Sequence, residues 1–168
     1  FEVGEADGQG FIAMEFVEGT SLRAWLRDER PWRAVLSVLL DAGEGLAAAH
    51  RAGLVHRDFK PENVLVAEDG RVRVVYFGLA RGDAGTSTAE SDARADGQTS
   101  PTARAGTPAY MAPEQAQGRE LDARADQYAF CVTSYEALHG TRPLLGERHV
   151  GRHRWPSGLD DALRRGLE

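Results

Sequence analysis

The stretch HRDFKPEN, residues 56–63, decides how the rest of the chain is interpreted. It gathers the polar side chains that a phosphoryl transfer needs into one short segment. Asp58 can accept a proton, Lys60 can neutralise a phosphate, and Asn63 can ligate a hard cation through its amide oxygen. For any one of these residues, a solvated charged loop is the simpler interpretation. The residues alone leave both interpretations open.

A long helix and a β-hairpin are predicted on the two sides of this stretch. Upstream, Pro31 is a favourable helix start, an apolar stripe at helical spacing follows it, and Gly53 is a natural end. Downstream, residues 63–67 and 72–76 are rich in β-forming residues, and the dipeptide Asp69-Gly70 between them suits a tight turn. The stretch therefore connects a helix to a hairpin.

The N-terminal part of the chain predicts further short elements. Residues 1–17 indicate two strands around the turn signal Asp7-Gly8. A short amphipathic helix is predicted next from apolar residues at helical spacing, with Thr20 or Ser21 as its N-cap; these residues are Leu22, Trp25 and Leu26.

The C-terminal part predicts one mobile segment and two helices. Residues 80–109 contain no Val, Ile, Leu, Met, Phe, Tyr, Trp or Cys, so by themselves they cannot bury enough surface to become ordered. A buried helix is predicted over about 123–139 and ends at Gly140, and a last short helix is predicted over 159–167.

Composition limits the class of protein and of partner. The chain has 168 residues, of which 42% are hydrophobic, and this is enough for one domain with its own core. The net charge of −6 argues against a nucleic-acid partner, and 19 of the 20 basic residues are arginine. Cys131 is the only cysteine, which excludes an intrachain disulfide and a thiolate-rich zinc site. Because no signal peptide and no membrane-spanning run are found, we expect a cytoplasmic location and no membrane contact within this segment.

The opening stretch resembles the protein-kinase catalytic loop H-R-D-x-K-x-x-N at all five fixed positions. Further resemblances occur in the family's order. Phe77-Gly78 matches the end of D-F-G, residues 106–111 resemble the loop that receives the substrate's next residue, and residues 112–114 match A-P-E. Upstream, residues 14–19 look like the kinase hinge. Lys60 and Thr107 are features of serine/threonine kinases, and the Arg-, Ala- and Gly-rich sequence resembles bacterial members.

This resemblance implies an α+β, mainly α fold. A kinase C-terminal lobe would span residues 20–168, and residues 1–19 would form a remnant β-hairpin of the N-terminal lobe together with the hinge. The catalytic loop would span 56–63 and the activation segment 76–114, and the lobe would be truncated at its C-terminal end. The implied cofactors are ATP and Mg²⁺, and the implied partner is a protein, as substrate or as binding partner.

The resemblance also assigns roles to individual residues. Asp58 would orient the substrate hydroxyl and accept its proton, Lys60 would stabilise the γ-phosphate, and Asn63 would hold Mg²⁺. Arg57 would meet a phosphate on the activation loop. The remaining assignments are Thr107 in the catalytic set, Met14, Glu15, Val17 and Leu65 around the adenine, and His56, Phe77, Gly78, Glu114 and Asp126 as structural support.

The chain departs from the kinase pattern in two ways. Tyr76 stands where the family places the aspartate that bridges Mg²⁺ to the phosphates, and a phenol with an ordinary pKa near 10 is a poor ligand for a hard cation. We therefore expect most of the activity to be lost. The chain also starts at the family's fourth strand, without the Gly-rich loop and the strand lysine, so the first hairpin is expected to expose an unpaired sheet edge.

Two functional interpretations remain open at this point. The first is a fragment of a serine/threonine protein kinase that transfers the ATP γ-phosphate to protein hydroxyls in its intact parent. The second is a pseudokinase module that binds protein partners, or nucleotide, without catalysis. Tyr76 favours the second interpretation. The presence together of Asp58, Lys60 and Asn63 favours the first.

Overall fold

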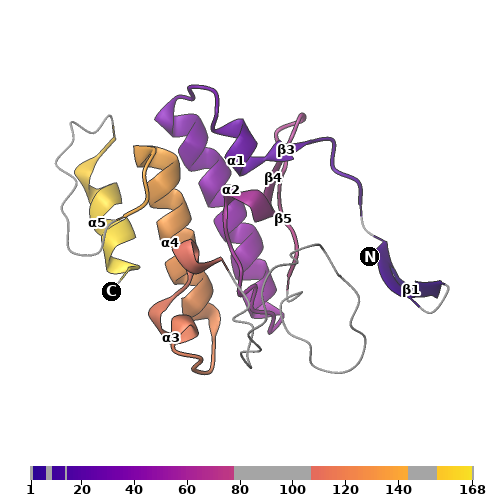
Figure 1. Ribbon diagram of the computed structural model, residues 1–168. Coiled ribbons are helices and arrows are strands. Elements are labelled where there is room, and N and C mark those ends of the chain that lie inside the picture. Colours follow the sequence, from indigo (N-terminus) through magenta and orange to yellow (C-terminus); the bar gives the residue numbers. More distant parts are fainter. Residues whose placement is uncertain (1, 7–8, 14, 78–106, 144–154, 168) are drawn as a thin grey trace, which may run out of the picture.

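The computed structural model arranges the helices and strands around two long helices that lie side by side (Figure 1). It describes residues 2–6, 9–13, 15–77, 107–143 and 155–167. The strands are β1 (Glu2–Ala6), β2 (Gln9–Ala13), β3 (Gly19–Ser21), β4 (Val64–Ala67) and β5 (Val72–Val74). The α-helices are α1 (Leu22–Trp25), α2 (Trp32–Arg51), α3 (Pro113–Ala116), α4 (Ala123–His139) and α5 (Ser157–Arg165), and the 3₁₀ turns are η1 (Pro61–Asn63) and η2 (Pro108–Tyr110).

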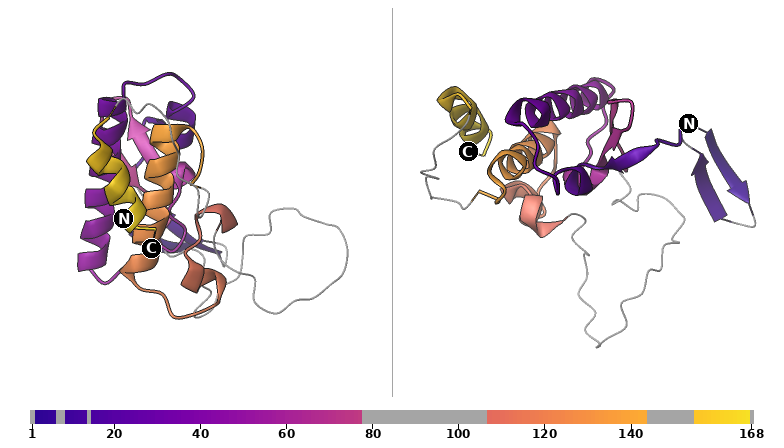
Figure 2. Two further views of the ribbon diagram at one scale, coloured as in Figure 1. Left: turned by 90° about the vertical axis from the view of Figure 1, so that its left-hand side faces the viewer. Right: turned by 90° about the horizontal axis from the view of Figure 1, so that it is seen from above.

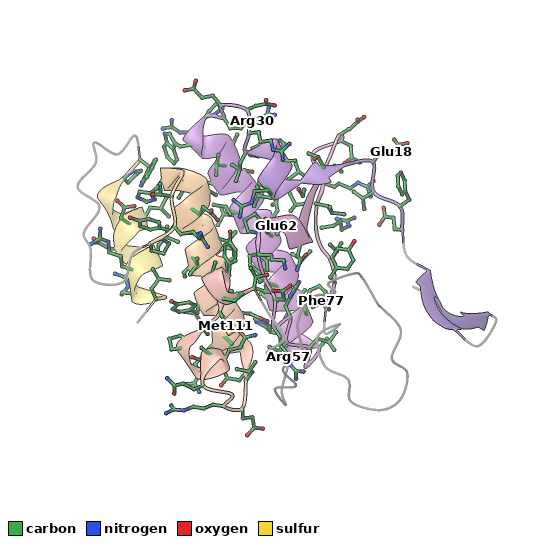
Figure 3. All side chains as sticks on the ribbon, in the orientation of Figure 1. Glu18, Arg30, Arg57, Glu62, Phe77 and Met111 are labelled. Carbon is green, nitrogen blue, oxygen red and sulfur yellow. The ribbon has the colours of Figure 1, made fainter. Side chains whose placement is uncertain are left out.

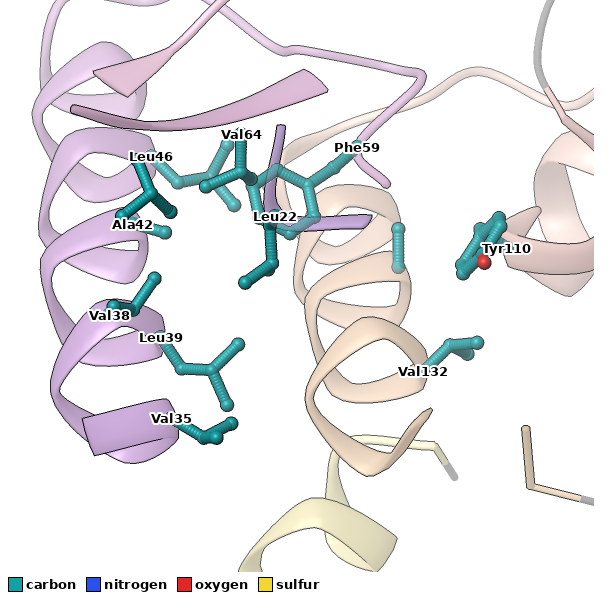
Figure 4. Close-up of a cluster of buried hydrophobic side chains, with 12 residues drawn as sticks. Leu22, Val35, Val38, Leu39, Ala42, Leu46, Phe59, Val64, Tyr110 and Val132 are labelled. Carbon is teal, nitrogen blue, oxygen red and sulfur yellow. The ribbon is translucent and has the colours of Figure 1, made fainter. Parts of the chain in front are cut away.

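The core lies between α2 and α4 and extends to β4. Side chains from one face of α2 meet those of α4, and Leu22 of α1 and Phe59 of the 56–63 stretch are inserted between them (Figure 4). Phe59 is only 1% exposed, and its ring lies 5.8 Å from that of Phe130 on α4. The polar residues on either side of Phe59 are therefore anchored to the core by a buried aromatic side chain. On the side of α4 away from α2, α5 packs against Cys131 and Tyr135 through Leu163 (Figure 1).

The second predicted hairpin is confirmed and belongs to a larger sheet. β4 and β5 pair antiparallel across the predicted turn, where Gly70 adopts a φ of 85°. β3, which was not predicted, pairs antiparallel with β4 and makes the sheet three-stranded. The predicted strand limits were wrong at three residues, Asn63, Val75 and Tyr76. Asn63 belongs to the 3₁₀ turn η1, and β5 ends at Val74 because Tyr76 has a φ of 66°, which no regular strand accommodates.

The first predicted hairpin is confirmed in its backbone. β1 and β2 pair antiparallel from Glu2 opposite Ala13 to Ala6 opposite Gln9. They form a two-stranded sheet of their own, which lies apart from the helices in the right-hand view of Figure 2. Since the described part of the chain adds no third strand to this sheet, each strand has one edge without a partner strand there.

The predicted helices are found with small shifts at their ends. Ser21, rather than Thr20, caps α1, and its hydroxyl accepts from the Ala24 N–H at 3.3 Å. α2 ends at Arg51, before Gly53 at a φ of 77°, and α4 has the predicted limits and ends at Gly140 at a φ of 75°. α5 starts two residues earlier than predicted, after Pro156. In the part of the chain that the structure describes, every helix is too short or too polar to span a bilayer.

Candidate active site

The backbone of the 56–63 stretch is held by one buried carboxylate. Asp126, in the first turn of α4, is 1% exposed and accepts hydrogen bonds from the His56 N–H and the Arg57 N–H, each at 2.7 Å. His50 of α2 contacts the same carboxylate through Nε2, also at 2.7 Å. The carboxylate therefore joins α2, α4 and the stretch. His50 lies at the spacing of the apolar stripe in the predicted helix, so the sequence carried no signal of this contact.

His56 ties the same stretch to the end of β5. Its Nε2 lies 2.8 Å from the Val75 carbonyl oxygen, and its Nδ1 accepts from the Asp58 N–H at 3.2 Å. The neutral ring with its proton on Nε2 satisfies both contacts. Burial lowers the pKa of His56, which keeps the ring in this form. The ring also packs on Phe77, with 4.7 Å between centroids, so the two residues assigned to structural support are in contact.

Four of the predicted residues form one hydrogen-bonded cluster. Lys60 Nζ donates to Asp58 Oδ2 at 2.7 Å and to Thr107 Oγ1 at 2.6 Å. The Thr107 N–H donates to Asp58 Oδ1 at 2.9 Å, and Asn63 Nδ2 donates to the Asp58 carbonyl oxygen at 2.7 Å. Burial alone would raise the pKa of the Asp58 carboxyl, but the hydrogen bonds from Lys60 and Thr107 outweigh it and lower the pKa below its ordinary value. Asp58 is therefore a carboxylate at neutral pH and can accept a hydrogen bond from a hydroxyl.

Arg57 lies beside this cluster in an unusual backbone conformation. Its φ is 70°, and its carbonyl oxygen accepts from Gln115 Nε2 of α3 at 2.7 Å. Its Nε is buried and has no hydrogen-bond partner among the residues that the structure describes. In Figure 3, Arg57 lies below Glu62 and Phe77, and the three labels mark the region of the candidate site. Gln115 carried no signal of this contact in the sequence. Gly78 and the other activation-segment residues up to 106 lie outside the described residues, so the expected phosphate acceptor of that segment does too.

The residues around Tyr76 do not fit a Mg²⁺ site. Val75, just before Tyr76, donates from its N–H to the Asn63 carbonyl oxygen at 2.9 Å, so the two segments are adjacent. Asn63 uses its amide nitrogen on Asp58, which leaves its neutral side-chain oxygen as a ligand, and Tyr76 adds only a phenol. Magnesium ions in proteins are usually bound by at least one carboxylate. Within the described ranges, no group of three or more His, Cys, Asp and Glu side chains is placed to hold a metal.

The residues predicted around the adenine lie next to β3 and β4. Leu65 of β4 pairs in register with Ser21 of β3, and residues 15–18 lead directly into β3. Glu15 is held there by Arg71, whose Nη1 lies 2.8 Å from Glu15 Oε1. Val17 is half-buried, whereas Phe16 is 85% exposed. Met14 lies outside the described residues.

A second charged cluster, which the sequence analysis missed, borders the site. Arg23 of α1 donates from Nε to Glu62 Oε1 at 2.8 Å and from Nη1 to Glu136 Oε1 at 3.1 Å, and it also contacts the Tyr110 hydroxyl. Tyr110 donates to Glu136 Oε2 at 2.5 Å. Burial would raise the pKa of Glu136, but the hydrogen bonds from Arg23 and Tyr110 lower it. This cluster links α1, η1, η2 and α4.

Glu114, another residue assigned to structural support, lies in α3. It lines a cleft of about 630 Å³ between α3, the start of α4 and the end of α5. Its carboxylate forms no hydrogen bond or ion pair with the rest of the described chain. The structure therefore does not bring Glu114 into the cluster around Asp58.

Comparison with known proteins identifies the family. The sequence model of one family, the protein kinase domain, matches residues 1–155 of this chain. This chain belongs to the protein kinase family. It is 42% identical over 149 residues to the serine/threonine-protein kinase PknL of Mycobacterium tuberculosis. The matched region covers 88% of this chain and 35% of that protein. It is 34% identical over 156 residues to the serine/threonine-protein kinase PknB of Mycolicibacterium smegmatis, which covers 89% of this chain and 24% of that protein.

A third bacterial relative gives the same result. The probable serine/threonine-protein kinase PknB of Corynebacterium glutamicum is 37% identical over 153 residues, which covers 88% of this chain and 22% of that protein. The predicted relationship to bacterial serine/threonine protein kinases is thus confirmed. This kinase chain spans about a third, or less, of the length of the curated relatives that it matches.

Proposed function

We propose that this chain is the C-terminal lobe and hinge of a serine/threonine protein kinase, and that its intact parent transfers the ATP γ-phosphate to protein hydroxyls. The observation that carries the proposal is the cluster of Asp58, Lys60, Asn63 and Thr107, in which every predicted catalytic side chain contacts another. The lobe assignment is supported by the helical core around α2 and α4 and by the small sheet beside the hinge residues. We infer a cytoplasmic location for this segment.

In this proposal, the chain's own residues orient the substrate hydroxyl, accept its proton and place a positive charge near the phosphate. The Asp58 carboxylate accepts the hydrogen bond of a substrate serine or threonine hydroxyl and then its proton. Lys60 lies within hydrogen-bond distance of the same carboxylate, so its ammonium is available to a phosphate that reaches this hydroxyl. Thr107 fixes both groups through its N–H and its hydroxyl.

Two further contacts are proposed at the edges of this site. Leu65 and the backbone of Glu15 and Val17, with Met14, would bind the adenine, because the hinge leads directly into the strand beside Leu65. The buried Arg57 Nε, which has no hydrogen-bond partner among the described residues, supports an anion contact there, and a phosphate on the activation segment is the anion we propose.

A second candidate function is favoured by one observation. Tyr76 replaces the metal-binding carboxylate, and its hydroxyl cannot supply the charge that Mg²⁺ requires. A pseudokinase that binds a protein partner or nucleotide without catalysis would keep the hydrogen-bonded cluster and lack the transfer. The two functions predict different effects on phosphorylation activity when a carboxylate is placed at position 76.

Mg²⁺-dependent phosphorylation of a generic protein distinguishes the two functions. It is measured for the longest polypeptide that the gene encodes, in its natural form and as Tyr76→Asp. Metal-assisted charge stabilisation is worth several kcal/mol, and each 1.36 kcal/mol is tenfold in rate, so we expect a gain of at least about 100-fold. The matched control is Tyr76→Asp with Asp58→Asn, which should return to background. Equal, robust activity in the natural and Tyr76→Asp forms would refute the claim that Tyr76 is disabling, and no activity in either would favour the pseudokinase.

A further inference from the structure

The backbone of Arg57 needs an external cause for its conformation. Among the described residues, Arg57 and Tyr76 are the two non-glycine residues with a positive φ, at 70° and 66°. For a residue with a long side chain, the left-handed region costs about 1–2 kcal/mol. Such a conformation persists only when its surroundings determine it from several directions.

Two side chains hold Arg57 on the two sides of its α-carbon. Asp126 Oδ1 of α4 accepts from the Arg57 N–H at 2.7 Å, and Gln115 Nε2 of α3 donates to the Arg57 carbonyl oxygen at 2.7 Å. The first contact fixes the peptide plane before Arg57, and the second fixes the plane after it. Between them they determine both backbone dihedral angles of this residue.

The second of these peptide planes also belongs to Asp58. The Arg57 carbonyl and the Asp58 N–H are parts of one planar unit. Gln115 holds its oxygen end, and His56 Nδ1 accepts from its N–H end at 3.2 Å. Because the plane ends at the Asp58 α-carbon, its tilt sets the direction in which the Asp58 carboxylate points.

We propose that Gln115 is a positioning residue that sets the orientation of Asp58 by holding the peptide plane between Arg57 and Asp58. α3 thereby becomes part of the active site, although the hydrogen bond of Gln115 is to Arg57, the residue before Asp58. A displacement of α3 would tilt the plane and turn Asp58 away from Lys60 and Thr107. The proposal rests on the role of Asp58 in the proposed function, and it adds the element that keeps Asp58 in position.

The test removes the donor and keeps the size of the side chain. Gln115→Met cannot donate to the Arg57 carbonyl. Gln117→Met is the matched control, because Gln117 is exposed just after the same short helix. Gln115→Asn is a second variant, whose amide is one methylene too short to reach, and it keeps the test valid if Gln115→Met does not fold.

The direct readout is the orientation of the Asp58 N–H. Residual dipolar couplings measured by NMR on this chain should change at Asp58 in both Gln115 variants, and amide exchange at Asp58 should become at least about tenfold faster. Couplings and exchange in α2 and α4 should stay as in the natural chain, and Gln117→Met should change neither. Unchanged Asp58 couplings in a folded Gln115 variant would overturn the proposal. Equal changes throughout the chain would also overturn it, because they would indicate a role in stability alone.

A kinetic readout separates this inference from the proposed function. The NMR measurements need neither ATP nor activity, so they hold if the chain proves to be a pseudokinase. In the Tyr76→Asp form of the longest polypeptide, Gln115→Met should lower kcat at least about tenfold with the KM for ATP unchanged. A reoriented Asp58 with undiminished kcat would contradict the proposed role of Asp58, while an unmoved Asp58 would contradict the role of Gln115.

Discussion

Replacing Asp126 by alanine should be among the most destabilising single changes in this chain. The substitution leaves the buried N–H groups of His56 and Arg57 without an acceptor. Each unsatisfied buried donor costs about 1–3 kcal/mol. His50 loses its contact too, but its side chain is 21% exposed and can turn to water. We therefore expect a loss of about 4 kcal/mol, which is a large part of the roughly 5–15 kcal/mol that stabilises an ordinary domain.

Urea unfolding followed by circular dichroism measures this loss. Asp122→Ala is the matched control, because Asp122 caps the same helix through the Arg124 N–H at 2.8 Å, but its side chain is 57% exposed. Loss of an N-cap costs about 1 kcal/mol. If Asp126→Ala unfolds the chain altogether, Asp126→Asn keeps one acceptor oxygen and should give a smaller, measurable loss. An Asp126→Ala variant no less stable than Asp122→Ala would refute the argument that this carboxylate holds the 56–63 stretch.

Three further predictions concern backbone conformation and pH. Tyr76→Asp should raise the free energy of unfolding by about 1 kcal/mol, because aspartate tolerates a positive φ better and the half-exposed ring gives up little burial. Stability should fall as the pH drops from 7 to 5, because burial lowers the pKa of His56 in the folded state, so the unfolded chain binds the proton more readily. Gly19→Ala should destabilise the β3–β4 pair, because its methyl group would overlap the Val66 carbonyl oxygen. Gly158→Ala meets no atom within 4 Å and should stabilise α5 by up to about 1 kcal/mol.

Each of these predictions has its own control, read by urea unfolding. Tyr76→Phe keeps the strained backbone and a ring, so a gain as large as that of Tyr76→Asp would show that strain is not the cause. The stability that neutral His56 contributes is complete above the ordinary histidine pKa of about 6.5. Its loss begins near that pH and continues as the pH falls through the lower folded-state pKa. His56→Gln should flatten the stability profile over this range, and an identical slope would contradict the assignment. A Gly19→Ala variant as stable as the natural chain would mean that β3 can move away from β4.

Local signals in the sequence were sufficient to predict the fold wherever one residue type determines the backbone conformation. Gly140 ends α4 and Gly70 turns the hairpin, because both need a left-handed conformation that glycine adopts without cost. The proximity of the residues in the cluster around Asp58 was predictable for a different reason. Its residues lie within one short stretch, so their proximity did not depend on knowing the fold, and only Thr107 came from elsewhere in the chain.

The missed features all depend on contacts between distant parts of the chain. β3 is a strand only because β4 lies beside it, and its three residues carry no pattern of their own. His50 occupies a position typical of a helix stripe, and only the fold brings it to Asp126, 76 residues away. Arg23 meets Glu136 across 113 residues in the same way. Charges that pair over such distances look like ordinary surface residues in a sequence.

Lys60 makes the candidate active site chemically addressable. It is the only lysine in the chain, so a reagent that acylates amines has one side chain to modify, apart from the terminal amine. Its Nζ is held by Asp58 at 2.7 Å and by Thr107 at 2.6 Å, and acylation requires that both contacts open. The rate of labelling at this single position therefore reports how often the cluster comes apart. A ligand that closes the cluster would slow the labelling, and mass spectrometry of the intact chain would register the difference without any assay of phosphoryl transfer.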